Sequence, residues 1–262
     1  MLNYFFGKRD TEKLPLLGNA SSLVVDVHSH VLPGLDDGAE NIEQSLALIS
    51  GLADLGYKKI IATPHIMSGY YDNTNEQILQ SLELVRIALK NAHINIQIEA
   101  AAEYYLDNEL LSAIENQKTL LTFGGNARYL LFETPLVGRS TSSLLESVIK
   151  IKKAGYTPVM AHPERYLYLY KEIEMLKRLR LNGVLFQLDI NSISNYYSKL
   201  AKESAELLIN QGMISFLGSN CHNINQLEGL KISRQKPHYQ IVSKQNILNN
   251  SLLETPSLVV SK

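Results

Sequence analysis

The chain has 262 residues, of which 25 are basic and 26 acidic, so its net charge at pH 7 is close to zero. This length suits one large α/β domain. The balanced charge disfavours non-specific binding to nucleic acid or to an anionic membrane, and no apolar stretch reaches the roughly 18 residues of a membrane-spanning helix. Cys221 is the single cysteine, which rules out a disulfide within the chain and favours a cytoplasmic location.

From residue 22 onward the chain alternates between strand-like and helix-like segments. Residues 22–28 are β-rich, and Gly56 is placed to end a helix over residues 41–57. Thr74 is placed to cap the next helix. The apolar stripes predicted for these two helices are Ile42, Leu46, Ile49, Ala53 and Leu55 in the first, and Ile78, Leu82, Val85 and Leu89 in the second.

The alternation predicts seven strands, over residues 22–28, 58–65, 94–105, 128–135, 157–165, 184–191 and 213–220. Strands that alternate with helices indicate a parallel sheet, and this count favours an incomplete barrel over an open sheet. No glycine-rich phosphate fingerprint follows the first strand, which also disfavours a dinucleotide-binding fold. We expect an N-terminal extension over residues 1–21, the main domain over 22–235, and a tail over 236–262 that the pattern does not place.

Side chains that suit metal binding recur where the predicted strands end. In a barrel of parallel strands these ends meet on one face, and five of the seven histidines lie there. Imidazole and carboxylate groups together suit Mn²⁺, Fe²⁺ or Zn²⁺. The candidates at the strand ends are His28, His30, Asp36, Asp37, His65, Glu103, Glu133, His162, Glu164, Arg165, Asp189, Asn191, Asn220 and His222.

The segment DVHSH, residues 26–30, ends the first predicted strand. Histidines two residues apart on a strand project to the same side, so His28 and His30 can both reach one ion. Asp26 lies on that side too and is expected to be buried beneath the imidazoles and to orient them.

Each candidate also has an ordinary interpretation. A lone Glu103 is more often a solvated loop carboxylate, and Arg165 more often a surface ion-pair partner. Because every strand end supplies a candidate, the set as a whole predicts a metal site. Taken singly, Asp36, Glu164, Asp189 and Cys221 are expected to be structural.

Six motifs, DVHSHVLPGLDDGAE, TPH, AAEYYLD, LFETP, AHPERY and GSNCHN, occur in this order between residues 22 and 223. Together they resemble a polymerase-and-histidinol-phosphatase (PHP) domain. More narrowly, they resemble the PHP-type protein-tyrosine phosphatases of bacterial capsule and exopolysaccharide operons (the CpsB/YwqE kind). The resemblance implies a distorted (β/α)7 TIM-like barrel, with two to three divalent metal ions at the C-terminal ends of its strands. Mn²⁺ is the expected ion, with Fe or Zn as alternatives.

The resemblance also implies roles for individual residues. The first ion would be held by His28 and His30, with Glu103 bridging to the second. Glu133 and His162 would complete the second site, and Asp37, His65 and His222 the third. Asp37 is preferred over Asp36 because it immediately precedes Gly38, as in the family motif. Arg165, with His162, is the expected catalytic pair, and Arg165 would hold the substrate phosphate.

The chain departs from the family pattern at Asn220, where the family has an aspartate that binds the first ion. An amide oxygen can bind a metal but brings no negative charge, so the first ion would be held more weakly. On this basis Asn220→Asp is expected to raise both activity and bound metal.

The leading hypothesis is hydrolysis of phosphotyrosine by a metal-activated hydroxide, with Arg165 neutralising the phosphoryl oxygens. Cys221 lacks the C-x5-R loop of thiol-dependent tyrosine phosphatases. The resemblance implies that the substrate is the tyrosine-rich tail of a bacterial tyrosine kinase. Two alternatives stand beside it. The first is another PHP or TatD-like phosphoesterase, acting on histidinol phosphate or as a nuclease, and the second is a weakened phosphotyrosine-binding regulator.

Overall fold

The computed structural model describes residues 23–136 and 141–256, so the predicted N-terminal extension lies outside the described residues. Within these ranges the strands are β1 (Val25–Asp26), β2 (Lys59–Ala62), β3 (His65–Ile66), β4 (Gln97–Ala100), β5 (Glu103–Tyr105), β6 (Tyr129–Glu133), β7 (Thr157–Ala161), β8 (Leu185–Asp189) and β9 (Ile214–Gly218). The α-helices are α1 (Ile42–Asp54), α2 (Asn75–Asn91), α3 (Asn108–Glu115), α4 (Thr141–Lys153), α5 (Ile173–Leu181), α6 (Lys199–Asn210), α7 (Ile224–Ser233) and α8 (Pro237–Val242).

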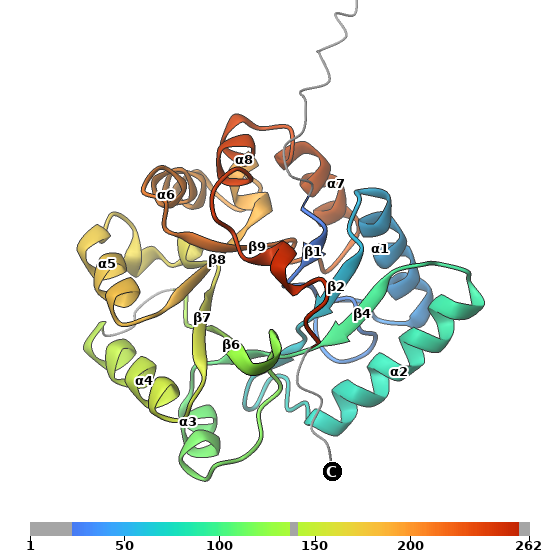
Figure 1. Ribbon diagram of the computed structural model, residues 1–262, viewed down its shortest axis with the longest axis horizontal. Helices are drawn as coiled ribbons and strands as arrows, with labels where there is room; N and C mark the ends of the chain where they lie inside the picture. Colours follow the sequence, from blue (N-terminus) through green and yellow to red (C-terminus); the bar gives the residue numbers. More distant parts are fainter. Residues whose placement is uncertain (1–22, 137–140, 257–262) are drawn as a thin grey trace, which may run out of the picture.

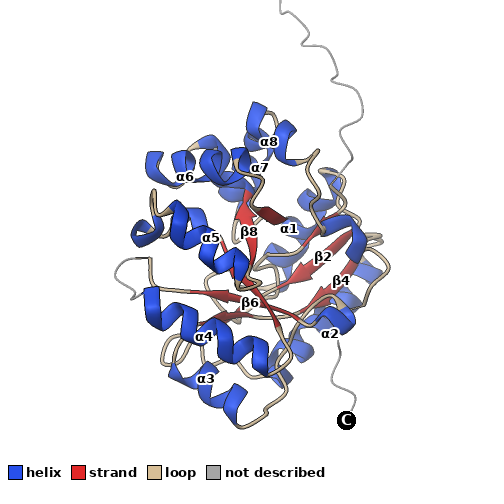
Figure 2. Cartoon of the chain, turned by 60° about the vertical axis from the view of Figure 1, so that its left-hand side comes forward, coloured by secondary structure: helices blue, strands red, loops and turns tan. Residues whose placement is uncertain are grey.

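The strands run around the middle of the molecule, and the helices lie outside them (Figure 1). The view in Figure 2, turned by 60°, shows the same arrangement with α3, α4, α5 and α6 on one side and α2 on the other. None of the helices in residues 23–136 and 141–256 is long and apolar enough to cross a membrane.

All strand pairs are parallel, as the alternation of strands and helices predicts. One sheet has the order β1-β2-β4 and the other the order β3-β5-β6-β7-β8-β9. The α/β fold with parallel sheets is therefore confirmed.

Two of the predicted strands are each divided into two shorter ones. Residues 58–65 form β2 and then β3, and residues 94–105 form β4 and then β5. Thr63 and Pro64 separate the first pair, and Pro64 lacks a backbone N–H for the ladder. Instead, the carbonyl of Pro64 accepts a hydrogen bond from the Glu103 N–H at 3.1 Å. Through these interruptions both segments leave the first sheet, which contains β2 and β4, and continue in the second, which contains β3 and β5.

Contacts also join the end of β1 to the segment after β9. Ser29 and Cys221 form a parallel bridge, and the Asn220 N–H donates to the His28 carbonyl at 2.8 Å. The His30 N–H donates to the Cys221 carbonyl at 3.0 Å. These bonds align the first and last predicted strand ends side by side.

The two predicted helices over residues 41–57 and 74–91 form as α1 and α2. Thr74 caps α2 in a capping box with Gln77, and Gly56 follows α1 with φ +93°. The stripe predicted for α2 is confirmed, because Ile78, Leu82, Val85 and Leu89 are all buried.

The stripe predicted for α1 is confirmed in part. Ile49 is buried, and Ile42, Leu46 and Leu55 are partly buried against the same core, but the fully buried Leu48 and Leu52 were not in the prediction. Helix α1 carries apolar residues on more than one face, and tertiary packing selects between them. Gly51 allows close approach of α7, because a Cβ at this position would lie 2.2 Å from a methyl carbon of Leu227.

Apolar side chains fill two layers. One cluster comes mainly from alternate strand residues that share a face: Val25, Val27, Ile61, Ala101, Leu131, Val159, Ala161 and Phe216, closed by Phe123 and Leu252. The larger cluster packs the other strand face, including Leu130 and Phe132, against helix residues such as Leu48 and Val85. Both faces of the strands are thus covered, as expected for a parallel sheet.

The described part of the predicted tail folds against the strands. After α8, a short 3-10 helix (Asn249–Leu252) lies beside β1 and β9. The buried Asn249 side chain donates to the carbonyls of Val25 and Leu217 at 2.9 and 2.7 Å and accepts from the Leu217 N–H at 2.9 Å. Asn249 therefore ties the first strand to the last.

Replacing Asn249 with alanine is expected to lower the free energy of unfolding by about 3 kcal/mol, because buried backbone groups lose their partners. Urea unfolding followed by circular dichroism measures the loss. The exposed Asn246→Ala is the matched control and should lie within about 0.5 kcal/mol of the wild type. Equal stability of the two variants would contradict a structural role for this segment.

Candidate metal centre

A polar cavity of about 210 Å³ lies where the strands end. Its lining comes from residues far apart in the sequence: Asp37, His65, Glu103, Glu133, His162, Arg165, Asn220, His222, Asn223 and Gln226. Eight of these ten were candidates from the sequence; Asn223 and Gln226, which cap and begin α7, were not.

His28 and His30 lie side by side at the floor of this site, as their spacing predicts. Both rings are fully buried, and their Nε2 atoms are 3.1 Å apart. The carboxylate of Glu103 reaches the same point, with Oε2 lying 3.0 Å from Nε2 of His28 and 3.4 Å from Nε2 of His30. The three side chains therefore converge on one position.

The far ring nitrogens of these two histidines each have a buried partner. Nδ1 of His28 lies 2.7 Å from Oε1 of Gln187, and Nδ1 of His30 lies 2.7 Å from Oδ2 of Asp36. A hydrogen bond at Nδ1 leaves the Nε2 lone pair directed at the shared point.

Sequence reasoning missed both orienting residues. Asp36 was expected to be structural and Gln187 was not considered. The adjacent pair Asp36 and Asp37 could have indicated that one of the two supports a histidine. Gln187 lies inside β8, and no local sequence pattern marks it.

Asp26 is buried as predicted, but it does not contact the imidazole rings. Its carboxylate accepts hydrogen bonds from the backbone N–H of His28 at 3.3 Å and from the N–H of Ser219 at 2.9 Å. Burial raises its pKa to about 6, although the bonds from Ser219 oppose this shift. Asp26 therefore ties β1 to the end of β9 and fixes the backbone beneath the site, whereas Gln187 orients the His28 ring.

Glu103 is the central carboxylate of the site. Its Oε2 also lies 3.3 Å from Nδ1 of His65, and its Oε1 lies 2.9 Å from Nε2 of His162. Burial alone would favour the neutral acid, but the histidines hold its pKa well below the usual range, with His28 and His65 contributing most. Glu103 is thus a buried anion shared by four imidazoles.

Glu133 extends the site away from β1. Its Oε1 lies 3.2 Å from Nδ1 of His65 and its Oε2 lies 4.0 Å from Nε2 of His162. Burial and the neighbouring Glu103 raise the pKa of this carboxyl. Glu103, Glu133 and His65 together form a second set of converging donor atoms.

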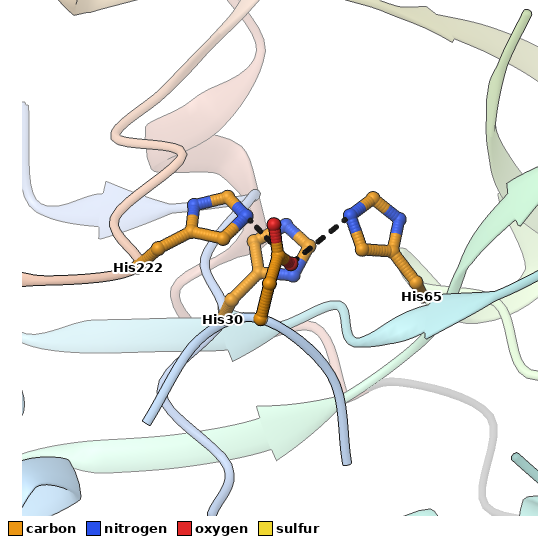
Figure 3. Close-up of side chains that lie close together, drawn as sticks. His30, His65 and His222 are labelled. Carbon is orange, nitrogen blue, oxygen red and sulfur yellow. Dashed lines mark ion pairs between the residues drawn. The ribbon is translucent and has the colours of Figure 1, made fainter. Parts of the chain in front are cut away.

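A third set lies toward solvent. His30, His65 and His222 surround a carboxylate, as Figure 3 shows. This carboxylate is Asp37, whose Oδ1 lies 3.4 Å from Nε2 of His222 and 3.6 Å from Nε2 of His65. The ring of His222 stacks on that of His30 with centroids 3.8 Å apart. Asp37 rather than Asp36 therefore faces the cavity.

The donor atoms fit divalent metal ions. In each of the three sets the candidate ligand atoms lie within 4.8 Å of one another. Two further buried atoms, Nδ1 of His162 and Oδ1 of Asn220, have no hydrogen-bond partner within the described residues. The sets differ from the sequence-based grouping, because His30 also belongs with His65 and His222, and His65 also belongs with Glu103 and Glu133.

The protonation of two histidines differs sharply. Burial and the nearby Arg165 guanidinium lower the pKa of His162 to about 3, so its imidazole is neutral and available as a ligand. Burial also disfavours the charged form of His65, but Glu103 and Glu133 outweigh it and raise its pKa to about 10. The two carboxylates on either side of His65 thus favour its protonated form.

Arg165 lies at the edge of the cavity in a 3-10 helix (Pro163–Arg165) that follows β7. Its guanidinium lies 4.2 Å from the centre of the Tyr197 ring, and Nη1 lies 4.0 Å from Oδ2 of Asp189. Besides Asp36, three residues were expected to be structural, and all three are buried: Glu164, Asp189 and Cys221. Asp189 lies beside this arginine, and burial raises the pKa of the Cys221 thiol, which stays protonated.

Glu164 is buried against Asp189. Its Oε1 accepts hydrogen bonds from the Asp189 N–H at 3.1 Å and the Ser192 hydroxyl at 2.8 Å. Burial, with the charge of Asp189, raises its pKa to about 8. Glu164 is thus a neutral acid at neutral pH.

Comparison with known proteins agrees with this geometry. A sequence model of the capsular polysaccharide synthesis family CpsB/CapC matches residues 24–234. Tyrosine-protein phosphatase YwqE of Bacillus subtilis (strain 168) is 27% identical over 203 residues, which cover 77% of this chain and 78% of that protein. Tyrosine-protein phosphatase CpsB of Streptococcus pneumoniae is 27% identical over 207 residues, which cover 77% and 84%.

A solved structure from work on YwqE of Bacillus subtilis and CpsB of Streptococcus pneumoniae, described as metal-dependent tyrosine phosphatases, has a similar fold. The TM-score is 0.71 at 24% identity, covering 91% of this chain and all of that one.

Asp36 and Asp37 are expected to respond differently to replacement by asparagine. Asp36 accepts bonds from the His30 ring and from the His65 N–H at 3.0 Å, so Asp36→Asn should cost about 2 kcal/mol of unfolding free energy in metal-free protein. The Asp37 side chain is 56% exposed, so Asp37→Asn should lower bound Mn²⁺ with little change in metal-free stability. If Asp37→Asn lowered metal-free stability and Asp36→Asn lowered only bound Mn²⁺, the supporting role would belong to Asp37 and the metal-binding role to Asp36.

Glu164→Gln is expected to gain stability over the wild type as pH rises from about 5 to about 8. Between its unfolded and folded pKa values, the folded protein holds a proton on Glu164 that the unfolded chain has released, so wild-type stability falls with rising pH in this window. Urea unfolding of metal-free protein at several pH values measures the difference. The exposed Glu146→Gln is the control and should follow the wild type. A pH-independent difference for Glu164→Gln would refute this assignment.

Proposed function

The chain belongs to the CpsB/CapC family of capsular polysaccharide synthesis proteins, and we propose that it is a metal-dependent protein-tyrosine phosphatase. The observation that carries the proposal is the convergence of five imidazoles, three carboxylates and Arg165 at one small polar cavity. The protein relatives named tyrosine-protein phosphatases support the reaction class.

The residues that would hold the ions are those that the sequence indicated: His28, His30, Asp37, His65, Glu103, Glu133, His162, Asn220 and His222. When bound, divalent ions lower the pKa of water and neutralise phosphoryl oxygens. We propose Mn²⁺ as the ion on the family resemblance, with Fe or Zn as alternatives, since imidazole and carboxylate donors without a thiolate fit all three. Asp36 and Gln187 keep the His30 and His28 rings turned toward the site.

Arg165 binds the phosphoryl group in this proposal. The Tyr197 ring and Asp189 support its guanidinium from behind, while 23% of the side chain remains exposed. A guanidinium can donate two parallel hydrogen bonds to phosphoryl oxygens and stabilise the charge that develops there. Burial, together with this positive charge, lowers the pKa of the neighbouring His162, so its imidazole is neutral and can bind an ion.

The cavity limits how much of the substrate enters. A volume of about 210 Å³ is below the roughly 300–1,000 Å³ typical of pockets that enclose a whole small ligand. The phosphoryl group fits inside, and the tyrosyl ring would remain at the mouth. Tyr71 stacks on His65 there with ring centroids 5.4 Å apart, and Tyr70 beside it is 77% exposed. An exposed, flexible protein segment is therefore the substrate we propose.

We propose the tyrosine-rich tail of a bacterial tyrosine kinase as the substrate, on the family resemblance alone. A cytoplasmic location agrees with the single, unpaired cysteine. We also propose that the strands close as a distorted seven-stranded barrel, supported by the Ser29–Cys221 bridge between the first and last strand ends.

Purified protein with Mn²⁺ is expected to release phosphate from a phosphotyrosine peptide and to lose this activity on chelation. Arg165→Ala should lower kcat/KM by about 100-fold, because a charged donor to the phosphoryl group is lost. Cys221→Ser should retain activity within about threefold, because the buried thiol takes no part. Phosphate release measured with malachite green follows all three.

Histidinol phosphate and single-stranded DNA are the comparison substrates in the same preparation. Faster turnover of either one would favour the corresponding alternative activity. Activity that survives chelation and disappears in Cys221→Ser would overturn the metal-dependent mechanism.

A further inference from the structure

The amide of Asn220 has a defined orientation. Its Nδ2 lies 3.0 Å from Oδ2 of Asp189, and only a donor can face a carboxylate at this distance. The carbonyl oxygen Oδ1 must then point the other way. It is buried without a hydrogen-bond partner among the described residues, and Asn220 lines the cavity. A buried acceptor left unpaired is costly, which suggests that a ligand completes it.

Asp189 is fully buried and, unlike Asn220, does not line the cavity. Its Oδ1 accepts from the Asn191 N–H at 2.9 Å, and its carboxylate also contacts the Tyr197 hydroxyl. The Arg165 guanidinium, 4.0 Å away, supplies a positive charge beside it. Burial raises the pKa of Asp189, but Arg165, the Tyr197 hydroxyl and the Asn220 amide all favour its charged form. These contacts point to a buried carboxylate that is held directly against the Asn220 amide.

We propose that Asp189 and Asn220 act as a pair, in which the buried Asp189 carboxylate supplies the negative charge that an aspartate at position 220 would otherwise bring. The charge acts through the Asn220 amide, because donation from Nδ2 to a carboxylate increases the electron density on Oδ1. Asn220 is then a neutral ligand supported from behind by an anion, rather than a defect of the site. This inference rests on the proposed metal centre.

The pair changes the expected effect of restoring aspartate at position 220. In Asn220→Asp the new carboxylate would face the Asp189 carboxylate at hydrogen-bond distance in a buried environment, where like charges repel strongly. In the double variant, Asp189→Asn with Asn220→Asp, the amide at position 189 can donate to the carboxylate at position 220. The contact then again has one donor and one acceptor. The two substitutions should therefore be strongly non-additive.

The test compares the wild type, both single variants and the double variant in chelator-treated, metal-free protein. Asn220→Asp is expected to lower the thermal unfolding midpoint by about 5 °C, and the added Asp189→Asn to restore it to within about 2 °C of the wild type. The exposed Asn195→Asp is the control for an added carboxylate and should leave the midpoint unchanged. If Asn220→Asp does not fold, a folded double variant supports the pair and an unfolded one overturns it.

Mn²⁺ titration of the same proteins is the second measurement. Asp189→Asn alone is expected to weaken Mn²⁺ binding at least tenfold, whereas the double variant should bind within about threefold of the wild type or more tightly. Wild-type Mn²⁺ affinity in Asp189→Asn, or an Asn220→Asp protein as stable as the wild type, would overturn the inference. Neither measurement uses a substrate, so a lack of phosphatase activity would count against the proposed function and leave this pair intact.

Discussion

The buried carboxylate of Glu103 is the interaction on which the site depends. It contacts His28, His30, His65 and His162, which come from the ends of three different strands besides its own. A buried anion is tolerated only when opposite charge or hydrogen bonds compensate it, so these strand ends must converge. The interruption between β4 and β5 makes this convergence possible, because it brings the Glu103 N–H to the Pro64 carbonyl and pairs β5 with β3 and β6.

The groups that face the cavity are positioned by a further layer of buried polar contacts. Gln187 and Asp36 hold the two histidines of the first strand, and Asp26 joins the backbone of that strand to Ser219. Such contacts fix ring direction and tautomer, which loosely placed imidazoles would lack. They also explain why several acidic residues at the strand ends are buried without lining the cavity.

The Asp189–Asn220 contact links the two halves of the proposed chemistry. Asp189 lies between the Arg165 guanidinium, which we propose binds phosphate, and the Asn220 amide, which lines the cavity. The orientation of the Asn220 amide therefore depends on Asp189, which lies 31 positions away in the sequence.

The sequence alone determined the alternation of strands and helices, the capping of α2 by Thr74 and the residues at the strand ends, because periodicity, caps and strand termini are local properties. The sequence pattern missed the divided strands, and for α1 it found Ile49 but not the equally buried Leu48 and Leu52, because several apolar faces were available and tertiary packing chose between them. Only the tertiary structure decided that Asp36 supports His30 while Asp37 faces the cavity, and that Asn220 contacts Asp189. These outcomes depend on strand register and on how neighbouring strand ends meet, which no local pattern encodes.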